Sequence, residues 1–325
     1  QDNEYLNILY ELMNSQVYYT VYPPVHQLCF YLAAFGDHNS PEQSAMVLRV
    51  LILIAEVVSF FFLVKILEYL KKPAYYALIY MLNPLIIVEL TGNLHFEAIM
   101  ICFLLGFIYF LIHKKYLSAT LFFNLSIATK LLPLMFVPAV MWYLYQKGEL
   151  RRFIISSIII SSIMFLPLFW SLDLNNFLSS IDLYFQKFEF NASIYYITRE
   201  IGRWMTGYNQ IAVIGPLFGI LTFLLILWFT KKTRPVLVNE MTDVFIFSFT
   251  VYLLLGTTIH PWYLSMLIVL CVFRLHYWII LWSFLVVFSY GVYAFEAIPY
   301  WLITLEYGLL FFMWMLEKKY PLQVN

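Results

Sequence analysis

Long apolar runs, separated by short polar loops, dominate the chain. A helix needs about 20 apolar residues to cross a bilayer, and runs near that length recur from residue 44 to the C-terminal region. The pattern predicts an all-α integral membrane protein, a polytopic bundle of about eleven membrane helices of which some are too short to span alone. The predicted helices cover residues 44–66, 74–91, 96–113, 116–130, 131–146, 152–170, 210–230, 241–257, 261–274, 277–294 and 299–317.

Two further segments are predicted to lie on the membrane surface. Residues 22–36 are too short to cross, and Pro23 and Pro24 suit the start of a helix. Residues 171–208 are amphipathic and aromatic, without an apolar run long enough to span. We find no soluble domain and no convincing repeat, so residues 1–325 are interpreted as one membrane domain with 1–43 and 171–208 as its non-spanning parts.

The composition supports this interpretation. Of the 325 residues, 63% are hydrophobic and only 12% are charged, which excludes an ordinary soluble domain. Membrane lipids are therefore expected partners, and nucleic acid is not. The three cysteines lie far apart in apolar segments, without the spacing of metal ligands, and are interpreted as packing residues.

Basic residues gather in loops that fall on one side if the predicted helices alternate across the membrane. The positive-inside rule places this side, and the C-terminus with it, in the cytoplasm. The remaining polar segments then share the outer, non-cytoplasmic face. The basic clusters are Lys65, Lys71 and Lys72; Lys114 and Lys115; Lys147, Arg151 and Arg152; Lys231, Lys232 and Arg234; Arg274; and Lys318 and Lys319.

One outer turn, NPLIIVELTGNLHFEAIM, concentrates polar chemistry in an apolar setting. Glu89, Asn93, His95 and Glu97 lie within nine residues. Two carboxylates and an imidazole can bind a divalent cation, orient a sugar hydroxyl or exchange protons. A solvated turn is the alternative, with Glu97 stabilised in the first turn of a helix by the helix dipole. The apolar context favours a site.

Lys130 lies between two apolar segments in FFNLSIATKLLPLMFVPAVMW. A lysine at a bilayer centre costs about 2.5 to 3.5 kcal/mol, so we expect it at a helix junction near the outer interface. Simple snorkelling of the side chain is one explanation. A lipid phosphate is the other, and we favour it because outer cations are rare in this chain.

A second outer turn, TTIHPWYLSM, places His260 beside Trp262 and Tyr263. Aromatic residues are common at membrane interfaces, but an imidazole among them can bind a phosphate or hydroxyl while the rings stack on a sugar. The 171–208 segment offers a similar mixture, for which a solvated amphipathic helix is an equally good explanation. Its polar residues are Glu189, Asn191, Arg199 and Arg203.

Together, the stretches VYPPVHQ, NPLIIVELTGNLHFEAIM, ATKLLPLMFVP, FEFNASIYYITREIG and HPWYL resemble the multi-spanning GT-C glycosyltransferases. Within them the chain is most similar to bacterial mannosyltransferase-like proteins related to the GPI mannosyltransferase I and DUF2029 groups. The resemblance implies inverting transfer of a sugar, mannose by analogy, from a polyprenyl-phosphate donor to a lipid or glycan acceptor. It also implies a bacterial inner membrane protein whose active site faces the periplasm.

The resemblance also suggests roles for the outer residues. A catalytic base is expected in the first outer loop, after a first helix that this chain is expected to lack. The metal requirement stays open, with a divalent cation as one possibility. The roles are catalysis for His95, Glu97 and Glu89; donor-phosphate binding for Lys130, His260, Arg199 and Arg203; and sugar or acceptor binding for Asn93, Trp262, Tyr263 and Asn191.

Two other functions stay open. A transporter or flippase of a lipid-linked or anionic solute could use the same cations along a path, but carriers usually place their site near the membrane midplane. Here the polar residues gather on one face, which favours an enzyme. A non-catalytic membrane subunit is the third possibility, because the usual catalytic acid is not evident.

Overall fold

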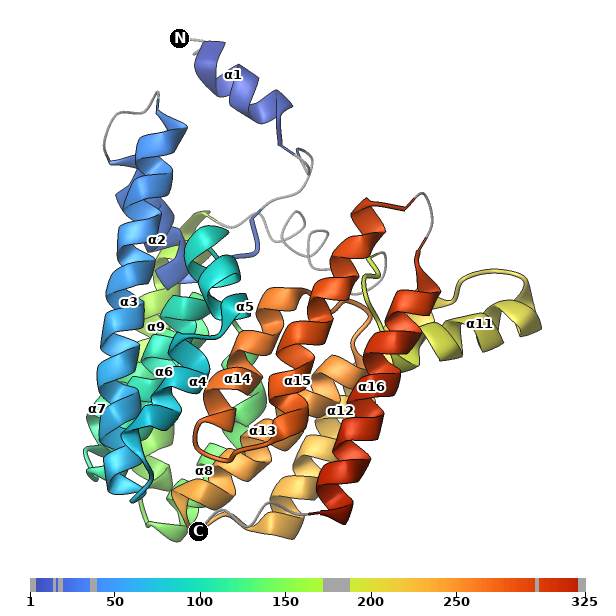
Figure 1. The fold of residues 1–325 in the computed structure, drawn as a ribbon. Coiled ribbons are helices and arrows are strands. Elements are labelled where there is room, and N and C mark those ends of the chain that lie inside the picture. The colour runs from blue at the N-terminus through green and yellow to red at the C-terminus, as the bar shows by residue number, and fades with distance from the viewer. Residues whose placement is uncertain are drawn as a thin grey trace.

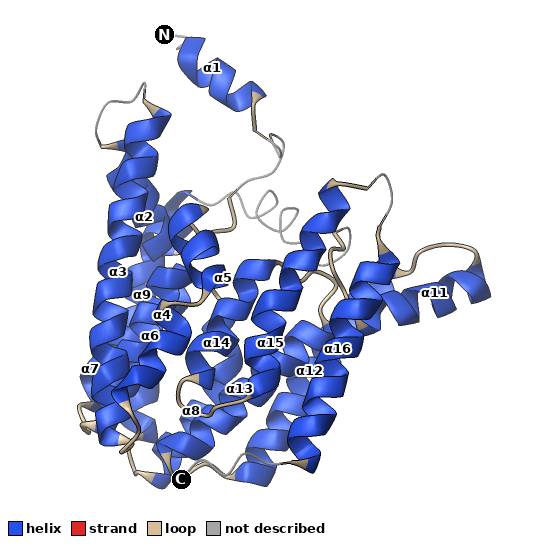
Figure 2. Ribbon diagram, in the orientation of Figure 1, coloured by secondary structure: helices blue, strands red, loops and turns tan. Residues whose placement is uncertain are grey.

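The structure, a computed structural model, describes residues 4–13, 16, 20–35, 40–171, 188–295 and 298–320. These residues form a bundle of helices, most of which run along one common direction (Figure 1). Within the described ranges the one strand-like feature is an isolated bridge between Phe190 and Thr258. The all-α prediction is confirmed (Figure 2).

Each predicted apolar run forms a helix or two consecutive helices. The predicted surface segment 22–36 contains α2, with Pro24 in its first turn. The segment 171–208 contains α11, while its residues 172–187 lie outside the described part. The α-helices are α1 Glu4–Glu11, α2 Pro24–Ala34, α3 Pro41–Tyr69, α4 Leu78–Met81, α5 Pro84–Ile86, α6 Glu97–Ile112, α7 Tyr116–Thr129, α8 Val137–Gln146, α9 Leu150–Ser171, α11 Ile194–Thr206, α12 Ile211–Thr233, α13 Val238–Leu255, α14 Ser265–Cys271, α15 Tyr277–Leu285 and α16 Tyr300–Lys319.

Prolines break several of the predicted helices into shorter pieces. The predicted helix 74–91 consists of Ala74–Met81 and Pro84–Gly92, which are bent by 51°. Pro84 cannot continue the preceding helix, and the Asn83 side chain accepts a hydrogen bond from the Leu85 N–H at 3.0 Å to start the next one. The turns at Leu132–Phe136 and Pro261–Leu264 are 3-10 helices for the same reason, each with a proline in its first turn.

Four helices, α3, α9, α12 and α13, are long and apolar enough to cross a membrane, or five if the bent pair counts as one span. Much of their apolar surface faces outward: Ile158 on α9 is 61% exposed and Phe223 on α12 is 56% exposed. Such surfaces fit a membrane protein, because soluble proteins rarely expose large apolar patches. The predicted count of about eleven membrane helices is not confirmed, since the remaining apolar helices are shorter.

The bundle has two chemically different ends. At one end of the bundle lie the loops that come after α3, α6, α8 and α12 in sequence. These loops carry the basic clusters, and we call this end the basic end. Distant segments meet there: Lys72 Nζ donates to the Phe273 carbonyl at 2.6 Å, and Arg274 pairs with Asp243 at 2.5 Å. The opposite end, where α6 begins and α7 stops, is called the site end. The helix α16 Tyr300–Lys319 ends at the basic end, and α1 lies beyond the site end (Figure 1).

Close packing of α6 against α7 brings two distant charged residues to the site end. A Cβ at Gly106 of α6 would lie 2.2 Å from Phe122 Cδ1 of α7, so only glycine permits this approach. Ser126 Oγ also donates to the Met100 carbonyl at 2.8 Å. Because α6 starts at Glu97 and α7 ends just before Lys130, the antiparallel pair places these two residues at the same end.

We expect the substitution Gly106→Ala to destabilise the protein by about 1–3 kcal/mol, because Phe122 is packed among other rings and cannot move away freely. The measurement is the apparent melting temperature in detergent. The control is Gly219→Ala on α12, where a Cβ meets nothing within 4 Å. An unchanged melting temperature for Gly106→Ala would show that the close approach is not required.

Candidate functional site

Lys130 and Glu97 form a buried ion pair at the site end. The helix α7 ends at Thr129 because Lys130 takes an extended backbone, as predicted for a helix junction. Lys130 Nζ donates to Glu97 Oε1, in the first turn of α6. Glu97 is fully buried, whereas the Lys130 side chain is 19% exposed. The second carboxylate oxygen of Glu97 is buried and has no protein donor, so it can accept a hydrogen bond from a ligand.

Four flat rings stack beside this ion pair. His95 lies on Trp262 with ring centroids 3.8 Å apart, and Trp262 lies on His260 at 4.3 Å. The other face of His260 is covered by Phe190 at 4.9 Å. Both faces of Trp262 are thus occupied by imidazoles, so this indole presents its edge and not a face to a ligand. The Tyr263 ring lies 5.6 Å from Lys130 Nζ.

Glu89 organises the turn that carries His95. Its Oε1 accepts a hydrogen bond from the Tyr290 hydroxyl at 2.5 Å, and its Oε2 accepts one from Asn93 Nδ2 at 3.2 Å. His95 Nε2 lies 3.5 Å from the same Oε2. The segment Ile87–Gly92 is a π-helix, a form that often marks functional sites.

The backbone of this turn is strained and held in place. Leu94 has a φ of +61°, in the left-handed region that a non-glycine residue rarely adopts. Arg49 of α3 donates to the carbonyls of Thr91 and Gly92 at 3.3 and 3.4 Å. Arg49 therefore holds the C-terminal end of the π-helix, whose carbonyls lack partners within the helix.

A third histidine belongs to the cluster. His26 of α2 is 3% exposed, and its ring stacks on that of Phe96 with centroids 3.8 Å apart. Phe96 is the residue directly before Glu97 in sequence. Tyr22 covers His26 at 4.0 Å. Its Nδ1 is buried without a hydrogen-bond partner, which leaves it available to a ligand.

All three histidines are neutral at pH 7. Burial, and then the positive charge of Lys130, lower the pKa of His26 to about 3 and that of His260 to about 4. Burial, Lys130 and His260 lower the pKa of His95 to about 3. The contact between His95 and Glu89 is therefore a polar contact and not an ion pair. The imidazoles can donate and accept hydrogen bonds around the single ammonium.

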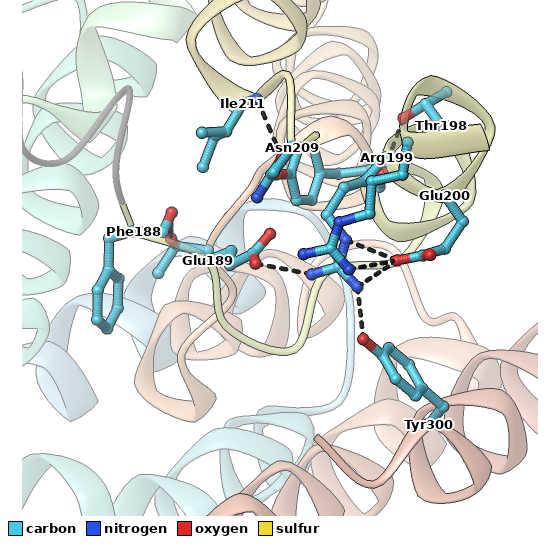
Figure 3. Close-up of polar contacts among 11 residues, drawn as sticks. Phe188, Glu189, Thr198, Arg199, Glu200, Asn209, Ile211 and Tyr300 are labelled. Carbon is cyan, nitrogen blue, oxygen red and sulfur yellow. Dashed lines mark hydrogen bonds and ion pairs between the residues drawn. The ribbon is translucent and has the colours of Figure 1, made fainter. Parts of the chain in front are cut away.

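A second polar group lies on α11, as Figure 3 shows. Arg199 is 1% exposed and donates to Glu189 at 2.7 Å, to Glu200 at 2.7 Å and to the Tyr300 hydroxyl at 2.5 Å. Arg203 is partly exposed and lies 3.3 Å from Glu200. Among the described residues, no hydrogen bond or ion pair joins either arginine to Lys130.

A large cavity lies beside the Lys130 cluster and not at it. It has a volume of about 1040 Å³ and is enclosed by α11, α12, α13, α15 and α16. Its lining is almost wholly apolar and includes Phe247, Trp282, Gly308 and Trp314. Ala192 is one of the lining residues and lies two positions after Phe190, whose ring packs on His260. The cavity therefore approaches the ring stack from the α16 side.

Residues 17–146 match the family model of the alpha-(1->6)-mannopyranosyltransferase N-terminal domain, MptA_B family. Over this stretch the chain is similar to a mannosyltransferase domain. The match covers about two fifths of the chain and includes His26, Glu89, His95, Glu97 and Lys130. It supports the resemblance to mannosyltransferase-like GT-C proteins. No curated protein matches the chain significantly.

The structure brings together eight of the eleven residues predicted for the site. They come from the α5–α6 turn, the end of α7 and the turn before α14. These residues are Glu89, Asn93, His95, Glu97, Lys130, His260, Trp262 and Tyr263. Arg199 and Arg203 form the separate group on α11, and Asn191 contacts Glu306.

Sequence reasoning missed His26 and Glu306. His26 stood in the quoted stretch VYPPVHQ, and its place after two prolines at a helix start was the available signal. Glu306 is one acid inside a long apolar run and gave none. As for a divalent cation, no group of three His, Cys, Asp or Glu in the described part of the chain is arranged to hold a metal.

We expect the protein to lose stability as the pH falls from 7 to 5. An unfolded histidine binds a proton near pH 6.5, whereas the buried His26, His95 and His260 bind one only near pH 3 to 4. The unfolded state therefore binds more protons in this window, so acid favours unfolding. The measurement is the apparent melting temperature in detergent at each pH.

The substitution His260→Phe tests one contribution to this slope. It keeps a flat ring between Trp262 and Phe190 but removes the titrating group, so the melting temperature should fall less between pH 7 and 5. His113→Gln, at an exposed position of the basic end, is the control and should keep the parent slope. Equal slopes for His260→Phe and the parent would contradict the burial of a neutral His260.

Proposed function

We propose that the protein transfers a sugar, mannose by its family match, from a polyprenyl-phosphate donor to a lipid or glycan acceptor at the Lys130 cluster. The observation that carries the proposal is the ammonium of Lys130, held by the buried Glu97 within a group of neutral imidazoles. A single cation in apolar surroundings suits a lipid phosphate, because its charge is poorly screened there.

Lys130 would stabilise the leaving phosphate. Glu97 takes one of its three N–H donors, which leaves the others for phosphate oxygens. During transfer the bond from sugar C1 to the phosphate oxygen breaks and a bond from C1 to the acceptor oxygen forms. The acceptor hydroxyl would give its proton to a carboxylate, for which Glu97 Oε2 is our candidate. Negative charge then develops on the phosphate beside an ammonium already in place.

The acceptor hydroxyl would meet Glu97, Glu89 and His95. Glu97 Oε2 has no protein donor and can accept a hydrogen bond from a substrate hydroxyl. With a pKa of about 3, His95 is too weak a base to remove a proton efficiently near pH 7, so we assign it a hydrogen-bonding role. Asn93 and the edge of Trp262 would line the same pocket.

The apolar cavity would hold the polyprenyl chain of the donor. From Tyr300 to Trp314 the wall formed by α16 is about 21 Å long, from 14 residues at a rise of 1.5 Å each. Glu200 and Tyr300 line the cavity and also accept hydrogen bonds from Arg199. Arg199 already contacts two carboxylates, so the partly exposed Arg203 is the better candidate to attract an anionic head group.

The site end would face away from the cytoplasm. The basic clusters lie at the opposite end of the bundle, where the positive-inside rule places the cytoplasm. In a bacterium the reaction would then occur on the periplasmic face of the inner membrane, with the C-terminus in the cytoplasm. Polyprenyl-phosphate donors carry their sugar on that face in the GT-C resemblance described above.

A lipid flippase is the second candidate, favoured by the same cavity. Its lining reaches from Glu200 near the site end to Asp243 and His276 near the basic end, which suits movement of a lipid between leaflets. For a flippase the Lys130 cluster would affect transport, whereas no new glycosidic bond would form.

We expect removal of the Lys130 charge to lower transfer from radiolabelled polyprenyl-phosphate mannose about 10²- to 10³-fold. Lys130→Ala alone leaves Glu97 buried without its partner, so Lys130→Met with Glu97→Gln is the variant of choice. Lys147→Ala, at an exposed position of the basic end, is the control. A double variant that folds and transfers at the parent rate would exclude the phosphate role.

We expect Gly308→Trp to discriminate between donors by chain length. Gly308 lines the cavity with open space at its Cβ position, so an indole there fills part of the proposed chain site. The value of kcat/KM should fall at least about tenfold for a long-chain donor and little for a short-chain analogue, a gap of about 1.4 kcal/mol. Gly219→Trp, on the exposed face of α12, is the control. Equal losses for both donors would place the chain elsewhere.

A further inference from the structure

Glu306 is a fully buried carboxylate that the proposed reaction does not use. It lies in the second turn of α16, and its described partners are neutral donors. Trp282 Nε1 donates to its Oε1 at 2.9 Å, and Asn191 Nδ2 lies 3.3 and 3.2 Å from its two oxygens. Burying a carboxyl group is costly unless its hydrogen bonds are made, so these contacts must form together with the fold.

Two neighbouring residues of α16 hold Asn191. Glu306 contacts its side chain, and the Tyr307 hydroxyl donates to its backbone carbonyl at 2.9 Å. Asn191 has a φ of +47°, a left-handed conformation that needs such support. The segment Phe188–Ser193 is thereby held to α16 at Asn191.

The same segment forms one wall of the ring stack. The Phe190 N–H donates to the Thr257 carbonyl at 3.0 Å, and the Ile259 N–H donates to the Phe190 carbonyl at 2.8 Å. These bonds align Phe190 with the turn that carries His260, and the two rings lie 4.9 Å apart. A continuous series of contacts therefore joins Glu306 to Asn191, to Phe190 and to His260.

We propose that Glu306 is a positioning residue, which fixes the segment Phe188–Ser193 and through Phe190 the His260–Trp262–His95 stack beside Lys130. This inference rests on the proposed function for its catalytic consequence. Trp282 and Tyr307, the two donors to this arrangement, also line the cavity. Glu306 thus contacts both a residue that lines the proposed lipid cavity, Trp282, and the segment that carries Phe190.

The first test is hydrogen exchange, which does not depend on activity. In detergent-solubilised Glu306→Ala, the Phe190 and Ile259 amides should exchange at least about tenfold faster than in the parent, a change of about 1.4 kcal/mol in local opening. Amides of α6 and α7 should keep their rates. Glu317→Ala, which removes a carboxylate near the far end of the same helix and its contact with His276, is the control. Unchanged exchange at Phe190 and Ile259 would overturn the proposal.

The second test is the kinetic effect. With the polyprenyl-phosphate donor, Glu306→Ala should lower kcat about tenfold or more per folded molecule and leave the donor KM within about twofold, because the cation is untouched. Glu306→Gln should recover part of the rate. Its carbonyl can accept from Trp282, and its amide can donate to the unpartnered Asn191 Oδ1 once the Asn191 side-chain amide turns over. A Gln variant no better than Ala would contradict this role.

Tyr307→Phe provides the milder variant if Glu306→Ala does not fold. It removes one hydrogen bond to the Asn191 carbonyl and keeps the ring, so exchange at Phe190 and Ile259 should rise by a smaller factor. If the variant exchanges faster but the parent protein itself transfers no sugar, the positioning role is supported and the proposed function is rejected. If the parent transfers sugar and the variants show unchanged exchange at Phe190 and Ile259, the proposed function is supported and the positioning role is rejected.

Discussion

The buried ion pair between Lys130 and Glu97 is the constraint on which the site depends. Breaking such a pair by removing one partner leaves an uncompensated charge and costs about 3–5 kcal/mol. Glu97 begins α6, and Lys130 follows the last residue of α7. Because the two helices are antiparallel and Gly106 lets them pack closely, these residues meet at the site end. Burial, and then the positive charge of Lys130, lower the pKa of the three histidines, so the imidazoles around this ammonium stay neutral.

An earlier and a later part of the chain supply different kinds of residues to the site. Residues 17–146, which match the mannosyltransferase domain, supply the charged groups and His26. The later part supplies the ring wall, with His260, Trp262 and Phe190 aligned by the bridge to Thr258. Glu306 lies behind that wall and beside the apolar cavity. A lipid chain in the cavity and a head group at Lys130 would therefore contact neighbouring parts of one arrangement.

The sequence predicted the helices well because apolar runs must be buried or face lipid, and prolines mark where they break. It also predicted that the NLHFE turn, Lys130 and the HPWY turn face one layer. The sequence could not predict which side chains contact one another in the folded protein. Amphipathic periodicity shows which face of α11 is polar, but not that Arg199 is saturated by Glu189 and Glu200. Trp262 was expected to stack on a sugar, yet imidazoles cover both of its faces, which only the tertiary arrangement reveals.

The central claim is that Lys130 binds the phosphate of a polyprenyl lipid. The most direct measurement compares the thermal stabilisation of the parent protein in detergent by polyprenyl phosphate and by the matching polyprenol. We predict that polyprenyl phosphate stabilises the parent more than polyprenol does, and that this difference disappears in the variant with Lys130→Met and Glu97→Gln. Equal stabilisation of the parent by both lipids, or an undiminished difference in the variant, would contradict the claim.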